Sequence, residues 1–312
     1  MYSDFHDLIN TLLKFDSKQR NCLSVSHSET PFNSGTVNKI QLLNVNMRDK
    51  NKNTALMITS LNQDLKLMNL LLENGADINA QNKDGYTPLL WSINPKGGKA
   101  AEFLIKAGAD VNLPKLDGIT PLMLAAKYGK NKLVKLILER TGSINQTADF
   151  GMTALRCACL NGRIDTAQIL IHEGASLINP ENNVTLLMSA SSKGYIELMK
   201  MLVHHGVDID ERARDGLTAI FYAISDSKIE SFKFLAECGT NLDITDYKGN
   251  TPLMFASGWN CLEIVELLIE KKVEINIKNL KGETALYIAK SEGHVKVAMA
   301  LRKAGAIESG FN

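Results

Sequence analysis

Two pairs of residues have side chains that could carry metal or redox chemistry. Cys157 and Cys159 are separated by one residue, and His204 is followed directly by His205. A redox pair has two residues between its cysteines, and a zinc site needs two further ligands nearby, so we favour core packing for the cysteines. The histidines precede Gly206 at the expected end of a helix. There they can contact the last carbonyl groups, and we favour this role over metal binding.

An acidic cluster could suggest a calcium loop, and its members are Asp208, Asp210, Glu211 and Asp215. The cluster falls in a segment where Asp and Asn are expected for turn formation, so we favour a solvated turn. The sequence contains no glycine-rich phosphate loop, and nothing in it places a nucleophile beside a base and an orienting acid. We therefore expect a protein that is not an enzyme, with no cofactor and no metal site.

The elements that position these residues repeat along the chain. The stretch "DGITPLMLAAKYGKNKLVKLILERTGSIN", residues 117–145, has looser copies that align on one threonine. The spacing between successive threonines is 33 residues, except for one step of 32. A fixed period of this kind indicates a repeat architecture. The aligned threonines are Thr54, Thr87, Thr120, Thr153, Thr185, Thr218, Thr251 and Thr284.

Each part of the repeat has a physical role. The threonine hydroxyl can cap the first N–H groups of a helix, and a proline directly after it, as at Pro121, suits the first helical position. Small residues such as Ala125 and Ala126 let a second helix approach closely. A glycine such as Gly129 ends the short first helix. Apolar residues at helical spacing then predict the second helix, which a glycine 21 residues past the threonine ends in most copies.

This unit resembles the ankyrin repeat, a turn plus two antiparallel helices with a T-P-L-H-x-A signature and a 33-residue period. The resemblance covers residues 44–306. It implies an all-α solenoid of eight helix–turn–helix units joined by β-turn or hairpin loops. The signature histidine is absent from every copy, and the copy at Thr185 has lost one residue from the turn before it. We expect the stack to be irregular and least stable there.

The two ends of the chain differ from the repeats. Residues 1–43 begin with an amphipathic segment, in which Phe5, Leu8, Ile9, Leu12 and Leu13 share one helical face, and continue as a polar stretch. We interpret them as an N-terminal capping helix and loop. Residues 44–306 form the repeat array and residues 307–312 a C-terminal tail. A polar C-terminal cap is favoured by Lys290, which stands where a small core residue is expected.

Composition narrows the remaining function classes. The net charge is +1, and neither half of the chain is basic enough to favour nucleic-acid binding. No apolar run is long enough for a membrane span, and the N-terminus does not resemble a secretory signal. Five cysteines, an odd number without paired spacing, suit a reducing compartment. We therefore expect a cytoplasmic protein, with nuclear localisation and delivery into a host cell as alternatives.

The resemblance also implies where a partner would bind. In this architecture the first helices and the turns line a concave face. Partner contacts come mainly from residues one, three and four before each threonine and seven and eight after it. Trp, Tyr and Arg dominate interface energetics, whereas the aliphatic candidates could simply cover neighbouring turns. We expect a protein partner to contact Tyr86, Ile119, Lys127, Tyr128, Phe150, Met152, Arg156, Leu160, Tyr247 and Trp259.

The expected function is a non-catalytic scaffold or adaptor that binds a protein partner through this groove. Lys127 and Lys130 lie beside Tyr128, which favours an acidic partner surface, and we expect the protein to be monomeric. Two alternatives stay open at this point. One is a regulatory or targeting subunit of an enzyme complex, and the other is a secreted effector that acts on host proteins.

Overall fold

The computed structural model describes residues 45–307, apart from residue 96 and residues 178–183. Within these ranges the chain forms sixteen α-helices and no strand, apart from one isolated bridge between Ala148 and Met152. It divides into two compact units, Met1–Cys157 and Ala158–Asn312, which are taken in turn. The predicted N-terminal cap (residues 1–43), the shortened turn before Thr185 and most of the tail lie outside the described residues.

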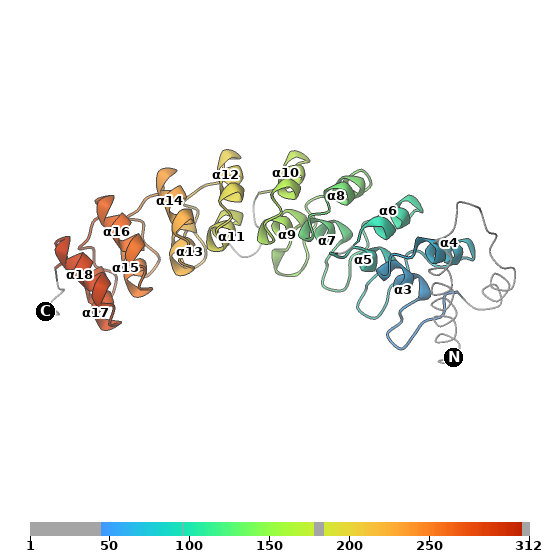
Figure 1. Cartoon of the computed structure of the whole chain (residues 1–312), viewed down its shortest axis with the longest axis horizontal. Coiled ribbons are helices and arrows are strands. Elements are labelled where there is room, and N and C mark those ends of the chain that lie inside the picture. The colour runs from blue at the N-terminus through green and yellow to red at the C-terminus, as the bar shows by residue number, and fades with distance from the viewer. Residues whose placement is uncertain (1–44, 96, 178–183, 308–312) are drawn as a thin grey trace, which may run out of the picture. The chain divides into compact units, whose positions relative to one another are not determined.

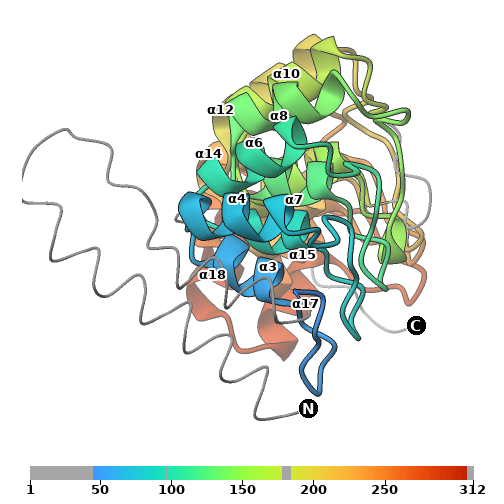
Figure 2. The same cartoon turned by 90° about the vertical axis from the view of Figure 1, so that its right-hand side faces the viewer.

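The first unit consists of helix pairs. The first helices of successive repeats pack against one another as one layer, and the second helices form a layer behind them (Figure 1). The long loops between repeats lie on one side of these helices, as the view along the stack shows (Figure 2). The helices are α3 (Ala55–Leu61), α4 (Leu65–Glu73), α5 (Pro88–Ser92), α6 (Lys99–Lys106), α7 (Pro121–Lys127) and α8 (Asn131–Leu138), followed by the 3-10 turn η1 (Asp149–Gly151).

The second unit repeats the same arrangement. Helices α11, α13, α15 and α17 pack in one layer, and α10, α12, α14, α16 and α18 pack in the other. The boundary between the units falls inside α9 (Ala154–Leu160). The helices are α10 (Ile164–His172), α11 (Leu186–Lys193), α12 (Ile196–His204), α13 (Ala219–Ser225), α14 (Ile229–Glu237), α15 (Pro252–Gly258), α16 (Leu262–Glu270), α17 (Ala285–Ser291) and α18 (Val295–Lys303).

The repeated threonine begins the first helix, as predicted. In seven repeats its Oγ1 accepts a hydrogen bond from the backbone N–H three residues later, with N···O distances of 3.1–3.4 Å. Pro88, Pro121 and Pro252 occupy the first turn, where no N–H donor is required. Thr218 is the exception, because its Oγ1 is buried without a partner among the described residues.

The end of the first helix depends on backbone conformation more than on residue type. Nine residues after the threonine, Gly194 has a positive φ of 74° and ends α11, as the sequence predicts. Gln63, Ser227 and Asn260 occupy the same place in other repeats and also have positive φ, 51° to 59°. The turn is therefore imposed by the packing of the two helices, and glycine only makes it less costly.

The core follows the predicted pattern. Leu122, two residues after the repeated threonine, is 4 % exposed, and Ala125 and Ala126 behind it are fully buried. Leu133, Val134 and Ile137 of the second helix complete this layer. The resulting core runs through each unit as a continuous apolar layer between the two rows of helices.

Backbone hydrogen bonds join neighbouring hairpin loops. In the hairpins that the structure describes on both sides, the residue four before a repeated threonine donates its N–H to the carbonyl three before the preceding threonine. In the first unit these bonds run from Leu116 to Asp84 (3.1 Å) and from Asp149 to Asp117 (3.0 Å). In the second they run from Tyr247 to Asp215 (3.3 Å) and from Leu280 to Lys248 (3.0 Å). The loops are thus fixed relative to their neighbours within each unit.

A second set of bonds links the turns that follow the second helices. The Asn79 side chain accepts the N–H of Asp110 at 2.9 Å, and the Asp243 carboxylate accepts the N–H of Glu274 at 3.0 Å. These acceptors are the last polar residues of the "ADIN" and "NLD" segments. The recurring Asp or Asn therefore connects repeats as well as forming its own turn.

Candidate protein-binding surface

The cysteine pair lies in the core, as the sequence predicts. Cys157 is 4 % exposed and Cys159 1 % exposed. Burial raises the pKa of the Cys157 thiol to about 11, although Lys127 and Arg156 act in the opposite direction. A thiol with so high a pKa is protonated at neutral pH, and therefore is neither a nucleophile nor a metal ligand there.

One histidine and two of the four acidic residues take the local roles expected of them. His205 ends α12, and its Nδ1 lies 2.8 Å from the Met201 carbonyl oxygen. The carboxylate of Asp208 accepts the N–H of Asp210 at 3.0 Å, and that of Asp215 accepts the N–H of Leu217 at 3.2 Å. These groups are occupied in forming turns and helix ends.

Large apolar side chains that remain exposed gather at two kinds of position. The first kind is a hairpin tip, three or four residues before a repeated threonine. The second kind is the end of a first helix, seven or eight residues after a repeated threonine. Each unit has three such residues. We call these positions the tip surface of each unit. Its large exposed apolar members are Leu61, Leu116 and Phe150 in the first unit and Tyr247, Trp259 and Leu280 in the second.

Two tyrosines of the first unit are each paired with a lysine. The Lys115 ammonium lies 5.4 Å from the centre of the Tyr86 ring, and the Lys127 ammonium lies 5.7 Å from that of Tyr128. Both rings are half-buried, whereas Lys127 is exposed. These cation–π pairs leave part of each ring available to a partner. Lys127 places positive charge beside Tyr128, whereas the charge of Lys115 is already paired with Asp117.

Phe150 has the most unusual backbone on the tip surface. Its φ of 59° and ψ of 29° lie in the left-handed region, and its side chain is 77 % exposed. The corresponding residues Asp84, Asp117 and Asp215 are not in this conformation. A bulky residue with positive φ is strained, so the hairpin holds an exposed aromatic side chain at a cost of stability.

The remaining predicted contact residues of the central repeats are less accessible. Ile119 and Met152, which directly precede repeated threonines, are half-buried, as are Arg156 and Leu160 on α9. Arg156 occupies the position of the absent signature histidine, and its Nε is buried. Leu160 falls in the second unit, so the structure does not bring all the predicted residues into one site.

In the second unit, Tyr247 is both exposed and anchored. It is 61 % exposed, yet its ring lies against the backbone of Gly216. A Cβ at Gly216 would come within 2.9 Å of the Tyr247 ring, and the φ of 82° at Gly216 also disfavours other residues. Trp259 follows the end of α15 and is 59 % exposed.

Three members of the tip surface were missed by sequence reasoning. Leu116 and Leu280 are 79 % and 81 % exposed, and Leu61 is 48 % exposed. The signal was present in the alignment of repeats, because Leu116 and Leu280 occupy the same place as Lys83 and Arg214. An apolar residue at a position that is charged in other repeats indicates exposure without packing.

Comparison with known families agrees with this geometry. A model of ankyrin repeats (three copies) matches residues 29–115, 98–181, 122–213 and 187–279. The chain belongs to the ankyrin-repeat family. Its fold is also similar to the crystal structure of the human ASB11 ankyrin repeat domain, with a TM-score of 0.62 and 22 % identity over 81 % of this chain and 98 % of that one. No curated protein matches the sequence.

The last ankyrin repeat exposes apolar side chains of its own. Val295 and Met299 on α18 are 67 % and 64 % exposed, and Ile307 after it is 66 % exposed. Met299 and Ile307 stand where other repeats have polar residues, such as Glu266 and Glu274. The described part of this ankyrin-repeat protein contains no helix that is both long and apolar enough to span a bilayer.

Proposed function

We propose that this ankyrin-repeat protein is a non-catalytic interaction module that binds a protein partner on its tip surface. Ankyrin repeats suggest such a role in general, and the distribution of exposed apolar side chains supports it here. Among the described residues, nine large apolar side chains are exposed, and six of them belong to the tip surface. This concentration carries the proposal, because scattered exposed hydrophobic residues would need no explanation.

The chemistry of the first unit favours an acidic partner. Lys127 lies against the ring of Tyr128, and Lys130 extends to the Pro95 carbonyl oxygen at 2.9 Å. Lys115 lies beside Tyr86 but is already ion-paired with Asp117, so Lys127 and Lys130 carry this argument. An acidic side chain of a partner would meet positive charge next to an aromatic ring. Such complementarity contributes mainly to specificity and to the association rate.

The wider organisation is part of the same proposal. Residues 1–43 would cover the start of the array, residues 44–306 would bind the partner, and the protein would act as a monomer in the cytoplasm. The odd number of cysteines supports a reducing compartment. No observation favours an enzyme subunit or a secreted effector over this function.

The test compares two substitutions that each remove an exposed large side chain. Phe150→Gly changes the tip surface and relieves the positive φ, so it should raise stability by about 1 kcal/mol. If Phe150 is a main contact, its loss should weaken binding by about 2 kcal/mol, roughly thirtyfold. Met299→Ala removes a similarly exposed side chain outside the tip surface and serves as the control.

The partner would first be captured from an extract of the source cell and purified. Its affinity for the parent protein and for each variant would then be measured by calorimetry, together with the melting temperature of each variant. The second variant for this test carries both Tyr247→Ala and Trp259→Ala. Binding on the tip surface would be refuted if this double variant and Phe150→Gly both bound the partner as tightly as the parent protein does.

A further inference from the structure

The last repeat that the structure describes is apolar at two positions where the other repeats are polar. The residue fifteen after the repeated threonine is polar in seven repeats and is Met299 in the last. The residue twenty-three after that threonine is also polar in seven repeats and is Ile307 in the last. Met299 and Ile307 are 64 % and 66 % exposed. A terminal repeat is expected to have a polar outer face, so these two residues depart from the expectation as well as from the other repeats.

Val295, the first residue of α18, lies on the same helix and is also exposed. Its counterparts Ile196 and Leu262 begin the second helices of inner repeats and are half-buried. Val295 is 67 % exposed, and no helix follows α18 in the described part of the chain. We call Val295, Met299 and Ile307 the terminal edge.

Contacts between inner repeats show what Met299 would meet. In the first unit the Glu102 carboxylate accepts a hydrogen bond from the Lys132 ammonium at 2.8 Å. In the second unit the Lys233 ammonium lies 3.6 Å from the Glu263 carboxylate. Glu102 and Lys233 stand at the position of Met299, and each contacts the second residue of the next second helix. The position of Met299 is therefore one from which a side chain reaches the second helix of a following repeat.

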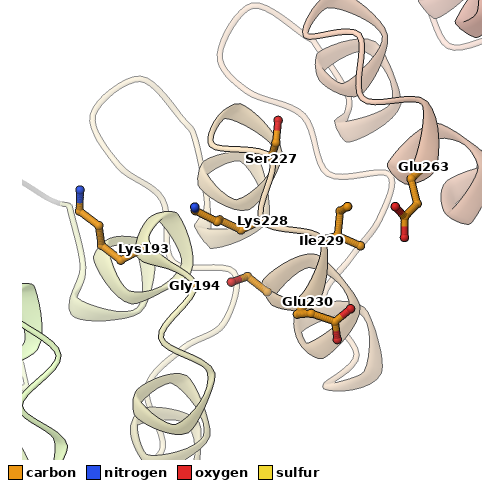
Figure 3. A pocket seen from close by; sticks show the side chains of 8 residues that line it. Lys193, Gly194, Ser227, Lys228, Ile229, Glu230 and Glu263 are labelled. Carbon is orange, nitrogen blue, oxygen red and sulfur yellow. The ribbon is translucent and has the colours of Figure 1, made fainter.

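Figure 3 shows this region between two inner repeats of the second unit. Glu230 and Glu263 project from the starts of α14 and α16, beside a pocket of about 410 Å³ that Ser231 also lines. Lys233 reaches both carboxylates, at 3.1 and 3.6 Å. Charged groups on this inner edge are thus paired within the array, whereas the side chains of the terminal edge can be covered only by apolar groups.

The charge of α18 indicates which kind of helix fits beside it. Lys296, Arg302 and Lys303 are exposed on α18, and the helix has no acidic residue. On its inner side α18 packs against α16, which has three glutamates and no basic residue. The array thus already places an acidic second helix beside this basic one. A second acidic helix on the outer side would also meet complementary charge, whereas α18 of a second copy would meet like charge.

We propose that the terminal edge binds an acidic amphipathic helix of a partner protein. Apolar residues of this helix would cover Val295, Met299 and Ile307, and its flanking carboxylates would face Lys296 and Lys303. A helix is favoured over a lipid surface because the position of Met299 contacts helices inside the array. The site uses none of the six residues that define the tip surface, and it goes beyond the proposed function.

The site can be tested on the full chain with two synthetic peptides. Each has about 18 residues, long enough to form an isolated helix, with leucines along one face and either glutamates or lysines along its flanks. Binding to the labelled protein would be followed through the ¹⁵N–¹H signals of Lys296, Met299 and Ile307. We expect saturable shifts with the acidic peptide that weaken at higher salt, and none with the basic peptide.

Two variants restore residue types that other repeats have at the same positions. Met299→Gln copies Gln168, and Ile307→Asn copies Asn241. Both replace exposed side chains, so the melting temperature should not change. Each should weaken binding of the acidic peptide about fivefold or more, the factor expected for losing one covered apolar side chain. The control is Lys200→Gln, which changes an exposed lysine at the position of Met299 in an inner repeat and should leave binding unchanged.

Other occupants of the terminal edge would give different results. Dimerisation in sedimentation that Met299→Gln abolishes would identify a second copy of the chain. Binding to vesicles of phosphatidylcholine and phosphatidylserine, without binding of the acidic peptide, would identify a lipid surface. Either result would overturn the proposal. So would an acidic peptide that shifts no signal of α18, or one that binds Met299→Gln and Ile307→Asn as tightly as the parent protein.

Discussion

The exceptional threonine of the array offers a test of helix capping with an internal control. Thr251 and Thr218 occupy equivalent places in neighbouring repeats, and both are buried. The Thr251 hydroxyl accepts the Met254 N–H at 3.3 Å, whereas the Thr218 hydroxyl has no partner in the described part of the chain. Thr218 has φ −113° and ψ 177°, compared with −84° and 165° for Thr251. Its first turn is instead closed by a bond from the Phe221 N–H to the Thr218 carbonyl oxygen, at 3.1 Å.

Replacing each threonine by valine, which has nearly the same shape, should therefore have opposite effects. Thr251→Val removes a cap and should lower stability by about 1 kcal/mol, or about 2–4 °C in melting temperature for a unit of this size. Thr218→Val removes a hydroxyl that is desolvated without compensation, which costs about 1–3 kcal/mol. It should leave stability unchanged or raise it by about 1 kcal/mol.

Hydrogen exchange is the appropriate assay, because a repeat array need not unfold in one step. Exchange of the Met254 amide and of the α15 amides around it should become faster in Thr251→Val. In Thr218→Val, exchange at Phe221 and along α13 should be unchanged or slower. Faster exchange of similar size in both variants would refute the argument, because it would mean that Thr218 caps its helix in solution.

Three further predictions concern the core, the thiols and the weakest repeat. Leu122→Ala should destabilise the protein by about 2–5 kcal/mol in urea denaturation, because Leu122 is 4 % exposed; a change below about 1 kcal/mol would contradict its place in the core. With a pKa of about 11, Cys157 has a thiolate fraction of roughly one in three thousand at pH 7.5. Iodoacetamide should therefore modify half-buried Cys261 before Cys157 in the native protein, as peptide mass spectrometry would show, and equal rates at these two thiols would be inconsistent with the burial of Cys157. Amides of residues 169–172 in α10 should exchange earlier than those of residues 134–138 in α8, because the turn before Thr185 is one residue short; equal protection would argue against a weak point there.

Much of the fold follows from local chemistry that the sequence displays directly. The threonine cap, the proline after it and the buried leucine are short-range features, and they predict the start and the core face of each first helix. The positive φ of Gln63, Ser227 and Asn260 has no such signal, because the packing of two helices imposes it on whatever residue is present. The lost cap of Thr218 is equally invisible, since its sequence context matches that of its neighbours.

The candidate surface was only partly predictable for a related reason. Alignment of the repeats shows which residues stand on hairpin tips, and Phe150, Tyr247 and Trp259 were found in this way. The exposure of Leu116 and Leu280 can be predicted from the same alignment only when the residue types at one repeat position are compared across all repeats. The pocket beside Ser231 could not be predicted from the sequence, because it depends on how α11, α14 and α16 pack around a residue that is shorter than its counterparts in the neighbouring repeats.

The bonds that join neighbouring hairpins have a consequence for protein engineering. They use only backbone atoms, so the side chains at these tips are not needed to form them. Leu116, Asp149, Tyr247 and Leu280 all donate the same bond, although they differ in size, charge and aromatic character. Substitutions at these four positions should thus allow binding specificity to be redesigned on a scaffold of constant spacing, whereas a change in hairpin length would disturb the loops on either side.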